Sequence, residues 1–299
     1  MVIWPRPSLS RQLKRETQKH VYVSEPLPVF LISFNRGRML LQTIAGLRKQ
    51  DRETRIIVHD NGSDDDETLA ILNCLQYEDV AVRFGNKISH ADELMLICET
   101  IGEYFQSHKV CNYAVSDCDV DLSASSHGPL TLYEKILEEH TDIDVAGPLM
   151  RLRDVPREYV LFNQAMNSHI HQVWKNVPLT MTIDGHIVHY CKFPIDTTLA
   201  VHQAGATFAR LRSGIRLYEP YDARHLDWYL IGDDPDHYTK SSNPAITHWN
   251  NAVGREMYKG VELIYQGYYG VRQSGKEYEI YWHDLNSAGP NLTEMRRGI

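Results

Sequence analysis

The sequence lacks long apolar runs, since no stretch of its 299 residues approaches the ~20 that a membrane-spanning helix needs. The first residues also lack the apolar segment of a secretory signal, so we expect no leader peptide and no integral membrane segment. The five cysteines are odd in number and form no CxxC pair, which supports neither a disulfide framework nor a structural zinc site. We expect reduced thiols and a cytoplasmic location.

Positive charge is scarce, because 31 Lys and Arg residues stand against 39 Asp and Glu residues and leave a formal net charge of −8. A general nucleic-acid binder needs a basic face that displaces phosphate counterions, so we expect no nucleic-acid partner. The exception is the N-terminus, where five basic residues precede Val21 and one acid, Glu16, accompanies them. We interpret residues 1–28 as a basic arm, either solvated or in peripheral contact with an anionic membrane surface or a partner.

Short apolar runs alternate with helical patterns over residues 29–150. The runs are typical of strands buried on both faces of a sheet, and they fall at 28–33, 55–59, 80–84, 112–116 and 145–148. Between the first two, Leu40, Ile44 and Leu47 recur at helical spacing. This alternation predicts a mostly parallel central sheet flanked by helices, which is a Rossmann-like α/β fold. No GxGxxG follows the first strand, so a dinucleotide site of the usual kind is not expected.

The pattern becomes mixed after residue 150, and we expect an α+β second half over residues 151–255. Residues 178–190 predict a hairpin, because Asp184 and Gly185 suit a type I′ turn between two runs of strand-forming residues. Tyrosines accumulate from residue 256 onward, and we treat residues 256–299 as a Tyr-rich C-terminal extension. Residues 29–255 then make up the main domain.

Polar side chains follow the predicted strands at the point where each strand ends. In an open α/β sheet, ligands bind at the carboxyl ends of the strands, so these residues predict one shared site. The candidates, in chain order, are Ser33, Asn35 and Arg36, then Asp60 and Asn61, then His90, then Asp117 and Asp119.

Asp117 and Asp119 carry the strongest chemical signal. Alternate residues of an extended segment point to the same side, so both carboxylates can approach one cation. Mg²⁺ and Mn²⁺ prefer oxygen ligands and commonly bridge protein carboxylates to phosphates of a substrate. The alternative is that both are turn residues after a strand, together with Asp121.

Asp60 stands directly at the end of the second predicted strand. A carboxylate there can accept the imino N–H of uracil or a similar base. The alternative is that it caps the following helix, which is how we interpret Asp64 to Glu67.

Four segments in this order resemble nucleotide-sugar glycosyltransferases of the GT-A fold. The nearest likeness is to the large inverting family that includes cellulose and hyaluronan synthases. The segments are PVFLISFNRGRMLLQTIAGL, IIVHDNGSDDDE, GNKISHADEL and NYAVSDCDVDLS, the last ending in a DxD motif. The third segment departs from the family, because its glycine-rich spacing is thinned.

The resemblance implies a GT-A fold in which residues 29–150 bind the nucleotide sugar and residues 151–255 bind the acceptor. It implies a divalent cation, Mn²⁺ or Mg²⁺, on Asp119, and we expect Asp117 to share it. We choose His248 as the third ligand, because GT-A enzymes often take one from the C-terminal region. The alternatives are other histidines of the second half: His169, His171, His186, His189 and His202. The resemblance also implies a catalytic carboxylate in the second half, for which we choose Asp227 as a general base across the sugar from the metal. Leu226 stands where the family has an acid, which leaves a different base or a retaining mechanism open.

The remaining residues that the resemblance assigns to the donor share the polar edge described above. They are Ser33, Asn35, Arg36, Asp60, Asn61, His90 and Asp117, which also serves the metal, together with Arg224 from the second half. Arg224 either clamps a phosphate or pairs with a nearby aspartate, and the sequence does not separate these.

We therefore expect a metal-dependent glycosyltransferase of the hexosyltransferase type, of the kind found in polysaccharide biosynthesis. It would transfer a sugar from a UDP- or GDP-linked donor to a saccharide, glycan or glycoconjugate acceptor, with inversion. One alternative is a sugar-phosphate nucleotidyltransferase, which we rank lower because the loop FNRGRM has a single glycine. The other is a non-catalytic saccharide-binding protein on the same fold.

Overall fold

The computed structural model describes residues 25–87, 95–126, 128–152 and 178–230, with a few positions between 153 and 177 and two strands after residue 267. The predicted arm up to residue 24, His90 and His248 lie outside the described residues. The described helices are α2 (Gly37–Arg48), α3 (Asp66–Leu75), α4 (Ile97–Ser107), α5 (Pro129–Glu139) and the short 3₁₀ helix η3 (Leu226–Tyr229). The first strands are β1 (Leu27–Ser33), β2 (Thr54–Asp60), β3 (Val80–Phe84), β4 (Tyr113–Asp117), β5 (Val120–Asp121) and β6 (Val145–Pro148).

The later strands come from the second half of the chain. They are β7 (Leu179–Ile183), β8 (His186–Ile195), β9 (Ala200–His202), β10 (Arg212–Leu217), β11 (Arg224–His225), β12 (Tyr268–Ser274) and β13 (Glu277–His283). Strands β12 and β13 pair with each other in a separate two-stranded sheet, which falls within the predicted C-terminal extension.

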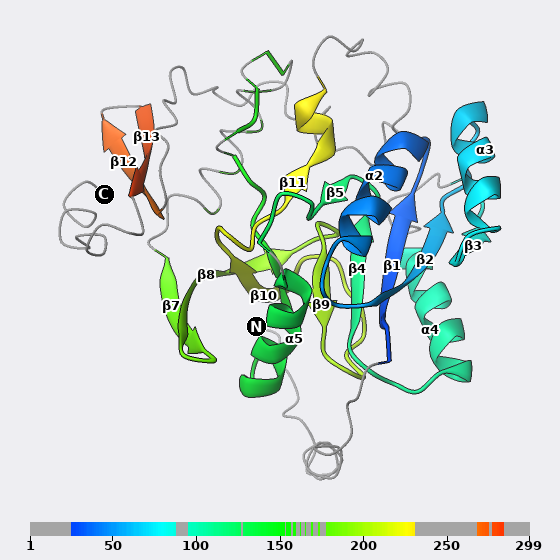
Figure 1. Ribbon diagram of the computed structural model, residues 1–299, viewed down its shortest axis with the longest axis horizontal. Helices are drawn as coiled ribbons and strands as arrows, with labels where there is room; N and C mark the ends of the chain where they lie inside the picture. The colour runs from blue at the N-terminus through cyan, green and yellow to red at the C-terminus, as the bar shows by residue number, and fades with distance from the viewer. Residues whose placement is uncertain are drawn as a thin grey trace, which may run out of the picture.

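The centre of the fold is a nine-stranded sheet in the order β3-β2-β1-β4-β9-β6-β10-β8-β7 (Figure 1). Strands β1 to β4 are parallel, β9 runs against both of its neighbours, and β6 and β10 are again parallel to each other. The predicted α/β architecture of GT-A type, with a largely parallel sheet flanked by helices and a mixed second half, is confirmed.

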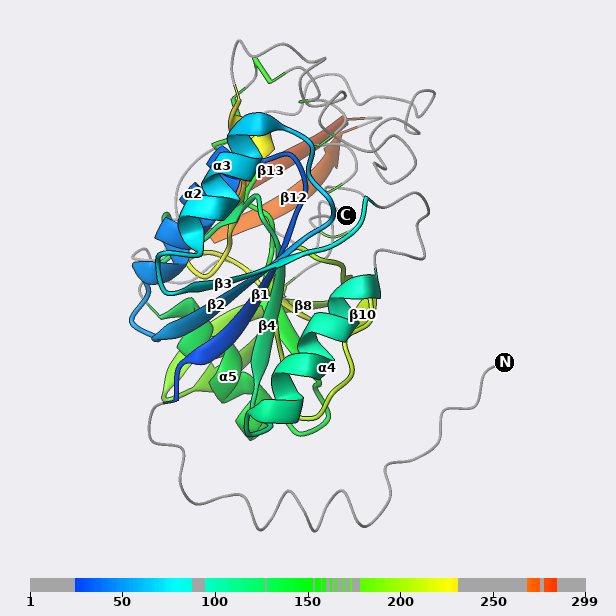
Figure 2. The same cartoon turned by 90° about the vertical axis from the view of Figure 1, so that its right-hand side faces the viewer.

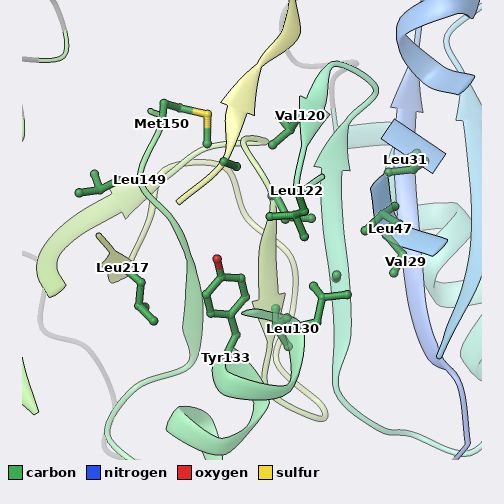
Figure 3. Packing of buried hydrophobic residues seen from close by; sticks show 14 of the residues in the cluster. Val29, Leu31, Leu47, Val120, Leu122, Leu130, Tyr133, Leu149, Met150 and Leu217 are labelled. Carbon is green, nitrogen blue, oxygen red and sulfur yellow. The ribbon is translucent and has the colours of Figure 1, made fainter. Parts of the chain in front are cut away.

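Strand β1 is buried on both faces, as its continuous apolar run predicts. Val29 and Leu31 belong to the core cluster that also contains Leu47 of α2, and Figure 3 shows these side chains near one another. Phe30 and Ile32 belong to the opposite cluster, where α4 packs. Alternate residues of one strand therefore hold α2 and α4 on opposite faces of the sheet (Figure 2).

Local patterns in the sequence predicted most of these elements. The helical apolar positions Leu40, Ile44 and Leu47 are buried positions of α2, and Pro129 is the first residue of α5. The hairpin of β7 and β8 turns at Asp184 and Gly185, which both have positive φ (51° and 79°), as a type I′ turn requires.

The nine-stranded sheet contains strands from both halves of the predicted main domain, because β9 pairs with β4 as well as with β6. The division into donor and acceptor halves remains a prediction about function. Among the described residues, no helix has the length and apolar character that crossing a bilayer requires.

One buried histidine of this sheet predicts how stability depends on pH. His202 is 3% exposed, stacks on Tyr113 at 5.0 Å between ring centroids and meets the edge of Phe208. Burial, with a smaller contribution from Arg212, lowers the pKa of His202 to about 3. The unfolded chain then binds a proton that the folded chain does not, so His202 reduces stability as pH falls below about 6.5.

We predict that His202→Phe, which keeps an aromatic ring, weakens this pH dependence. The fall in the free energy of unfolding between pH 7 and pH 5 should be smaller in the variant than in the wild type, by about 2 kcal/mol. Urea denaturation at both pH values measures the difference. Equal losses in the two proteins would show that His202 is not held neutral by the fold.

Candidate functional site

The carboxyl ends of β1, β2 and β4 meet at one edge of the sheet, as predicted. Ser33 pairs in register with Asp60, and Ile32 pairs with Asp117. Ser33 is fully buried, and its Oγ has no hydrogen-bond partner in the part of the chain that the structure describes. The edge therefore gathers Ser33, Asp60 and Asp117 although they are far apart in the chain.

Asn35 ties the loop after β1 to the loop after β2. It adopts a left-handed conformation (φ 50°), and its Oδ1 accepts hydrogen bonds from the backbone N–H groups of Asp64 (2.9 Å) and Asp65 (3.1 Å). Its own N–H donates to Ser63 Oγ at 2.9 Å. These contacts give Asn35 a loop-positioning task that the sequence pattern did not indicate, beside the donor contact that stays a prediction.

Asp60 shapes the turn at the end of β2. Its Oδ2 accepts from the backbone of Gly62 (3.1 Å) and Ser63 (2.8 Å), and its Oδ1 accepts from Ser63 Oγ (2.6 Å). The helix cap of α3 is instead Asp65, which accepts from Thr68 N at 2.8 Å. A carboxylate has about four acceptor positions, so Asp60 keeps capacity for one further donor. Asn61, which is also buried, follows directly.

The DxD segment leaves the main sheet just after β4. Asp117 ends β4, Asp119 lies in the following turn, and β5 then pairs antiparallel with β11, with Val120 opposite His225. The backbone N–H of Leu226 donates to the carbonyl of Asp119 at 2.7 Å. This short pairing brings residues 225–227 beside Asp119.

The result is a compact group of three potential metal ligands. Single ligand atoms of Asp119, His225 and Asp227 lie within 4.8 Å of one another. Both aspartates are 1% exposed, and the His225 side chain is 12% exposed. Asp119 Oδ1 lies 3.9 Å from His225 Nε2, and no described residue forms a hydrogen bond with it. Carboxylate oxygens suit Mn²⁺ and Mg²⁺, and imidazole is a common ligand of transition metals, so the residues present fit a divalent cation.

His225 supplies positive charge to this group. It forms an ion pair with Asp227 and stacks on Trp228, with 5.0 Å between ring centroids. Burial by itself lowers the pKa of His225, but the Asp227 and Asp119 carboxylates outweigh it and raise the pKa to about 9. A cation bound at His225 has to replace its proton, because only neutral imidazole is a ligand.

Asp117 does not belong to this three-residue group. Its Oδ2 accepts from Thr197 Oγ1 at 2.5 Å, and its backbone N–H donates to the carbonyl of Thr197 at 2.6 Å. Burial and the nearby Asp119 carboxylate raise the pKa of Asp117 above its ordinary value. The two aspartates of the DxD motif therefore have different partners, and a metal contact of Asp117 remains a prediction.

The structure pairs Arg224 with a nearby aspartate, one of the two alternatives that the sequence left open. Its guanidinium donates to Asp154 at 2.7 Å and lies 5.3 Å from the ring centroid of Tyr229. The Tyr229 hydroxyl also donates to Asp154, at 2.6 Å. A phosphate contact of Arg224 remains a prediction.

Asp227, which we chose from the sequence as a general base, lies beside Asp119. Its carboxylate is part of the candidate metal group, because the pairing of β5 with β11 folds it against Asp119. His225 was not predicted at all. His225 lies two residues before Asp227, the same spacing as between the two aspartates of the DxD motif. That spacing was the available sequence signal for a second pair of ligands, but nothing distinguished His225 from the other histidines among the 15 in the chain.

Comparison with known families supports the resemblance seen in the sequence. The family model of glycosyl transferase family 2 matches residues 29–87, which run from β1 to the residues after β3. This match confirms the resemblance to GT-A glycosyltransferases, while the finer likeness to cellulose and hyaluronan synthases stays a prediction. No curated protein matches the sequence significantly.

Solved structures that align with the chain do so at low similarity. Mannosyltransferase PcManGT from Pyrobaculum calidifontis, in complex with GDP-Man and Mn²⁺, has 15% identity and a TM-score of 0.35 over 64% of this chain and 50% of that chain. S. aureus TarS 1-349 in complex with UDP-GlcNAc has 16% identity and a TM-score of 0.34, covering 59% and 45%. Glucosyl-3-phosphoglycerate synthase from Mycobacterium tuberculosis has 14% identity and a TM-score of 0.31, covering 67% and 63%. The chain spans about half the length of the first two.

We predict that His225→Gln weakens Mn²⁺ binding at least ~10-fold, the usual minimum effect of damaging a metal site. The free Mn²⁺ signal in electron paramagnetic resonance measures binding directly. His186→Gln, an exposed histidine at the β7–β8 turn, is the matched control and should bind as the wild type does. Unchanged binding by His225→Gln would remove His225 from the site.

Proposed function

We propose that the chain is a divalent-metal-dependent glycosyltransferase that moves a sugar from a nucleoside-diphosphate donor to a saccharide or glycoconjugate acceptor. The observation that carries the proposal is the Asp119, His225 and Asp227 group, placed where β4 leaves the sheet. The glycosyltransferase family 2 match covers the neighbouring strand ends that contain Ser33 and Asp60. The candidate cation ligands and the residues proposed to contact the nucleotide base thus lie along one edge of the sheet.

The chemistry needs positive charge at the leaving group. Breaking the bond between sugar and phosphate builds negative charge on the departing diphosphate, and a divalent cation bound here would supply neutralisation as a Lewis acid. Asp119, His225 and Asp227 would hold that cation. Arg36, whose Nη1 lies 2.5 Å from Asp119 Oδ2, places a second positive charge beside them.

The nucleotide base is proposed to bind over the ends of β1 and β2. Within residues that the structure describes, Asp60 keeps one acceptor position and the buried Ser33 Oγ at the same edge has no hydrogen-bond partner. These groups support recognition of a base N–H, as in a UDP- or GDP-linked donor. A sugar-phosphate nucleotidyltransferase would instead prefer a nucleoside triphosphate as its substrate. A non-catalytic saccharide-binding protein would turn over neither a nucleotide sugar nor a nucleoside triphosphate.

Asp227 has two possible tasks in this scheme, and the geometry favours one of them. A general base in an inverting transfer must face the acceptor hydroxyl. Asp227 instead pairs with His225 and accepts a hydrogen bond from the Tyr159 hydroxyl at 3.3 Å. We therefore assign Asp227 to the metal, and the inverting course of the reaction remains part of the proposal without an assigned base.

We predict that Asp60→Ala raises the donor KM roughly 10-fold or more and changes kcat much less, because a base contact lies far from the reacting carbon. Release of UDP or GDP from a panel of nucleotide sugars, with Mn²⁺ present, provides the assay. Asp66→Ala is the matched control, because Asp66 is an exposed residue in the first turn of α3. An unchanged donor KM would limit Asp60 to holding the turn. Absence of turnover with every donor would count against the proposed function.

We predict that Asp227→Asn loses activity together with Mn²⁺ affinity. A ligand role should weaken Mn²⁺ binding by ~10-fold or more. A base role would instead lower kcat by ~10²–10⁴-fold and leave Mn²⁺ binding intact. Paramagnetic resonance titration beside the turnover assay separates the two outcomes, and the second one would restore the original expectation for Asp227.

A further inference from the structure

Arg36 lies against the carboxylate of Asp119, one of the three side chains of the candidate metal group. Its Nη1 is 2.5 Å from Asp119 Oδ2, in an ion pair whose side chains are 17% and 1% exposed. The other oxygen, Asp119 Oδ1, has no hydrogen-bond partner among the described residues. Arg36 therefore neutralises one side of this buried carboxylate, and His225 Nε2 lies 3.9 Å from its other oxygen, where a cation shared by Asp119 and His225 would bind.

The backbone of Arg36 is firmly held, while its side chain is partly exposed. Arg36 is the N-cap residue of α2, and its carbonyl accepts from Leu40 N at 3.0 Å. The next residue, Gly37, donates its N–H to Thr68 Oγ1 at 3.0 Å. A side chain beyond Cα at Gly37 would clash, because its Cβ would come within 2.9 Å of Thr68 Cα. The backbone here is therefore closely packed against α3, and the Arg36 side chain is the part that reaches solvent.

A cation bound to Asp119 and the Arg36 guanidinium compete for the same carboxylate. Two positive charges that share one nearly buried carboxylate repel each other, and the limited solvent there screens this repulsion poorly. The first turn of α2 contains no acidic residue, and the positive end of the helix points to this region. A diphosphate would provide both cations with anionic oxygens and would relieve the competition.

We propose that Arg36 is an exchangeable counter-ion of Asp119 that couples cation binding to binding of the nucleotide diphosphate. Without nucleotide, Arg36 holds Asp119 and weakens the site for a cation. With nucleotide, the guanidinium transfers to the diphosphate and leaves Asp119 to the cation. By linkage, the cation strengthens nucleotide binding by the same factor. The inference rests on the proposed function.

The test is a Mn²⁺ titration of the full chain, followed by paramagnetic resonance, without nucleotide and with UDP or GDP. In Arg36→Gln, we expect Mn²⁺ alone to bind about 10-fold tighter than in the wild type, within the usual range of coupling effects. In the same variant, the Mn²⁺ dissociation constant measured without nucleotide, divided by the one measured with nucleotide, should be smaller than in the wild type by a similar factor. The matched control is Arg38→Gln, which removes the same charge from an 83% exposed side chain that pairs with Glu67. It should leave both quantities unchanged.

Two outcomes are kept apart by this design. If wild-type protein binds neither Mn²⁺ nor either nucleotide, the proposed function fails. If it binds both, but Arg36→Gln binds Mn²⁺ alone no tighter than the wild type, Arg36 is only a structural ion-pair partner and the inference is overturned. Arg36→Met retains most of the side-chain bulk without the charge, and it provides the same comparison should Arg36→Gln not fold.

Discussion

The candidate site depends on one short antiparallel pairing, that of β5 with β11. Only two residue pairs make up this ladder, Val120 with His225 and Asp121 with Arg224. It nevertheless joins the turn after β4 to a segment far along the chain. Two features support it from outside: Leu226 N donates to the Asp119 carbonyl at 2.7 Å, and Asp121 Oδ1 accepts from Ser123 N at 2.8 Å. Without this pairing, Asp119 would have neither His225 nor Asp227 beside it.

Close packing of α2 explains why this turn has little freedom. A Cβ at Gly46 would collide with Asp121 Oδ1, so the helix approaches β5 as closely as glycine permits. Thr43 of the same helix donates its hydroxyl to the Cys118 carbonyl at 2.8 Å. The helix that begins after Arg36 therefore also supports the backbone on both sides of Asp119. Helix α2 thus affects both the charge beside Asp119, through Arg36 at its start, and the packing of the turn, through Thr43 and Gly46.

The sequence predicted the part of the molecule that local periodicity encodes. Strand β1 is buried at every position because both of its faces are covered, and the hairpin at Asp184 and Gly185 needs only turn chemistry. The polar residues after β1, β2 and β4 could be assigned to one edge, because parallel strands end together. The partners of Asp119 could not be predicted in this way. They depend on a long-range pairing of two-residue strands, which leaves almost no periodic pattern in the sequence.

The continuous sheet has a mechanical consequence. Strand β9 pairs with β4 on one side and with β6 on the other, so the hydrogen-bond ladder is unbroken from β3 to β7 in the described residues. Segments on either side of β9 cannot rotate relative to each other as two lobes without breaking that ladder. Any opening or closing around a substrate would therefore have to leave the pairing of these strands intact.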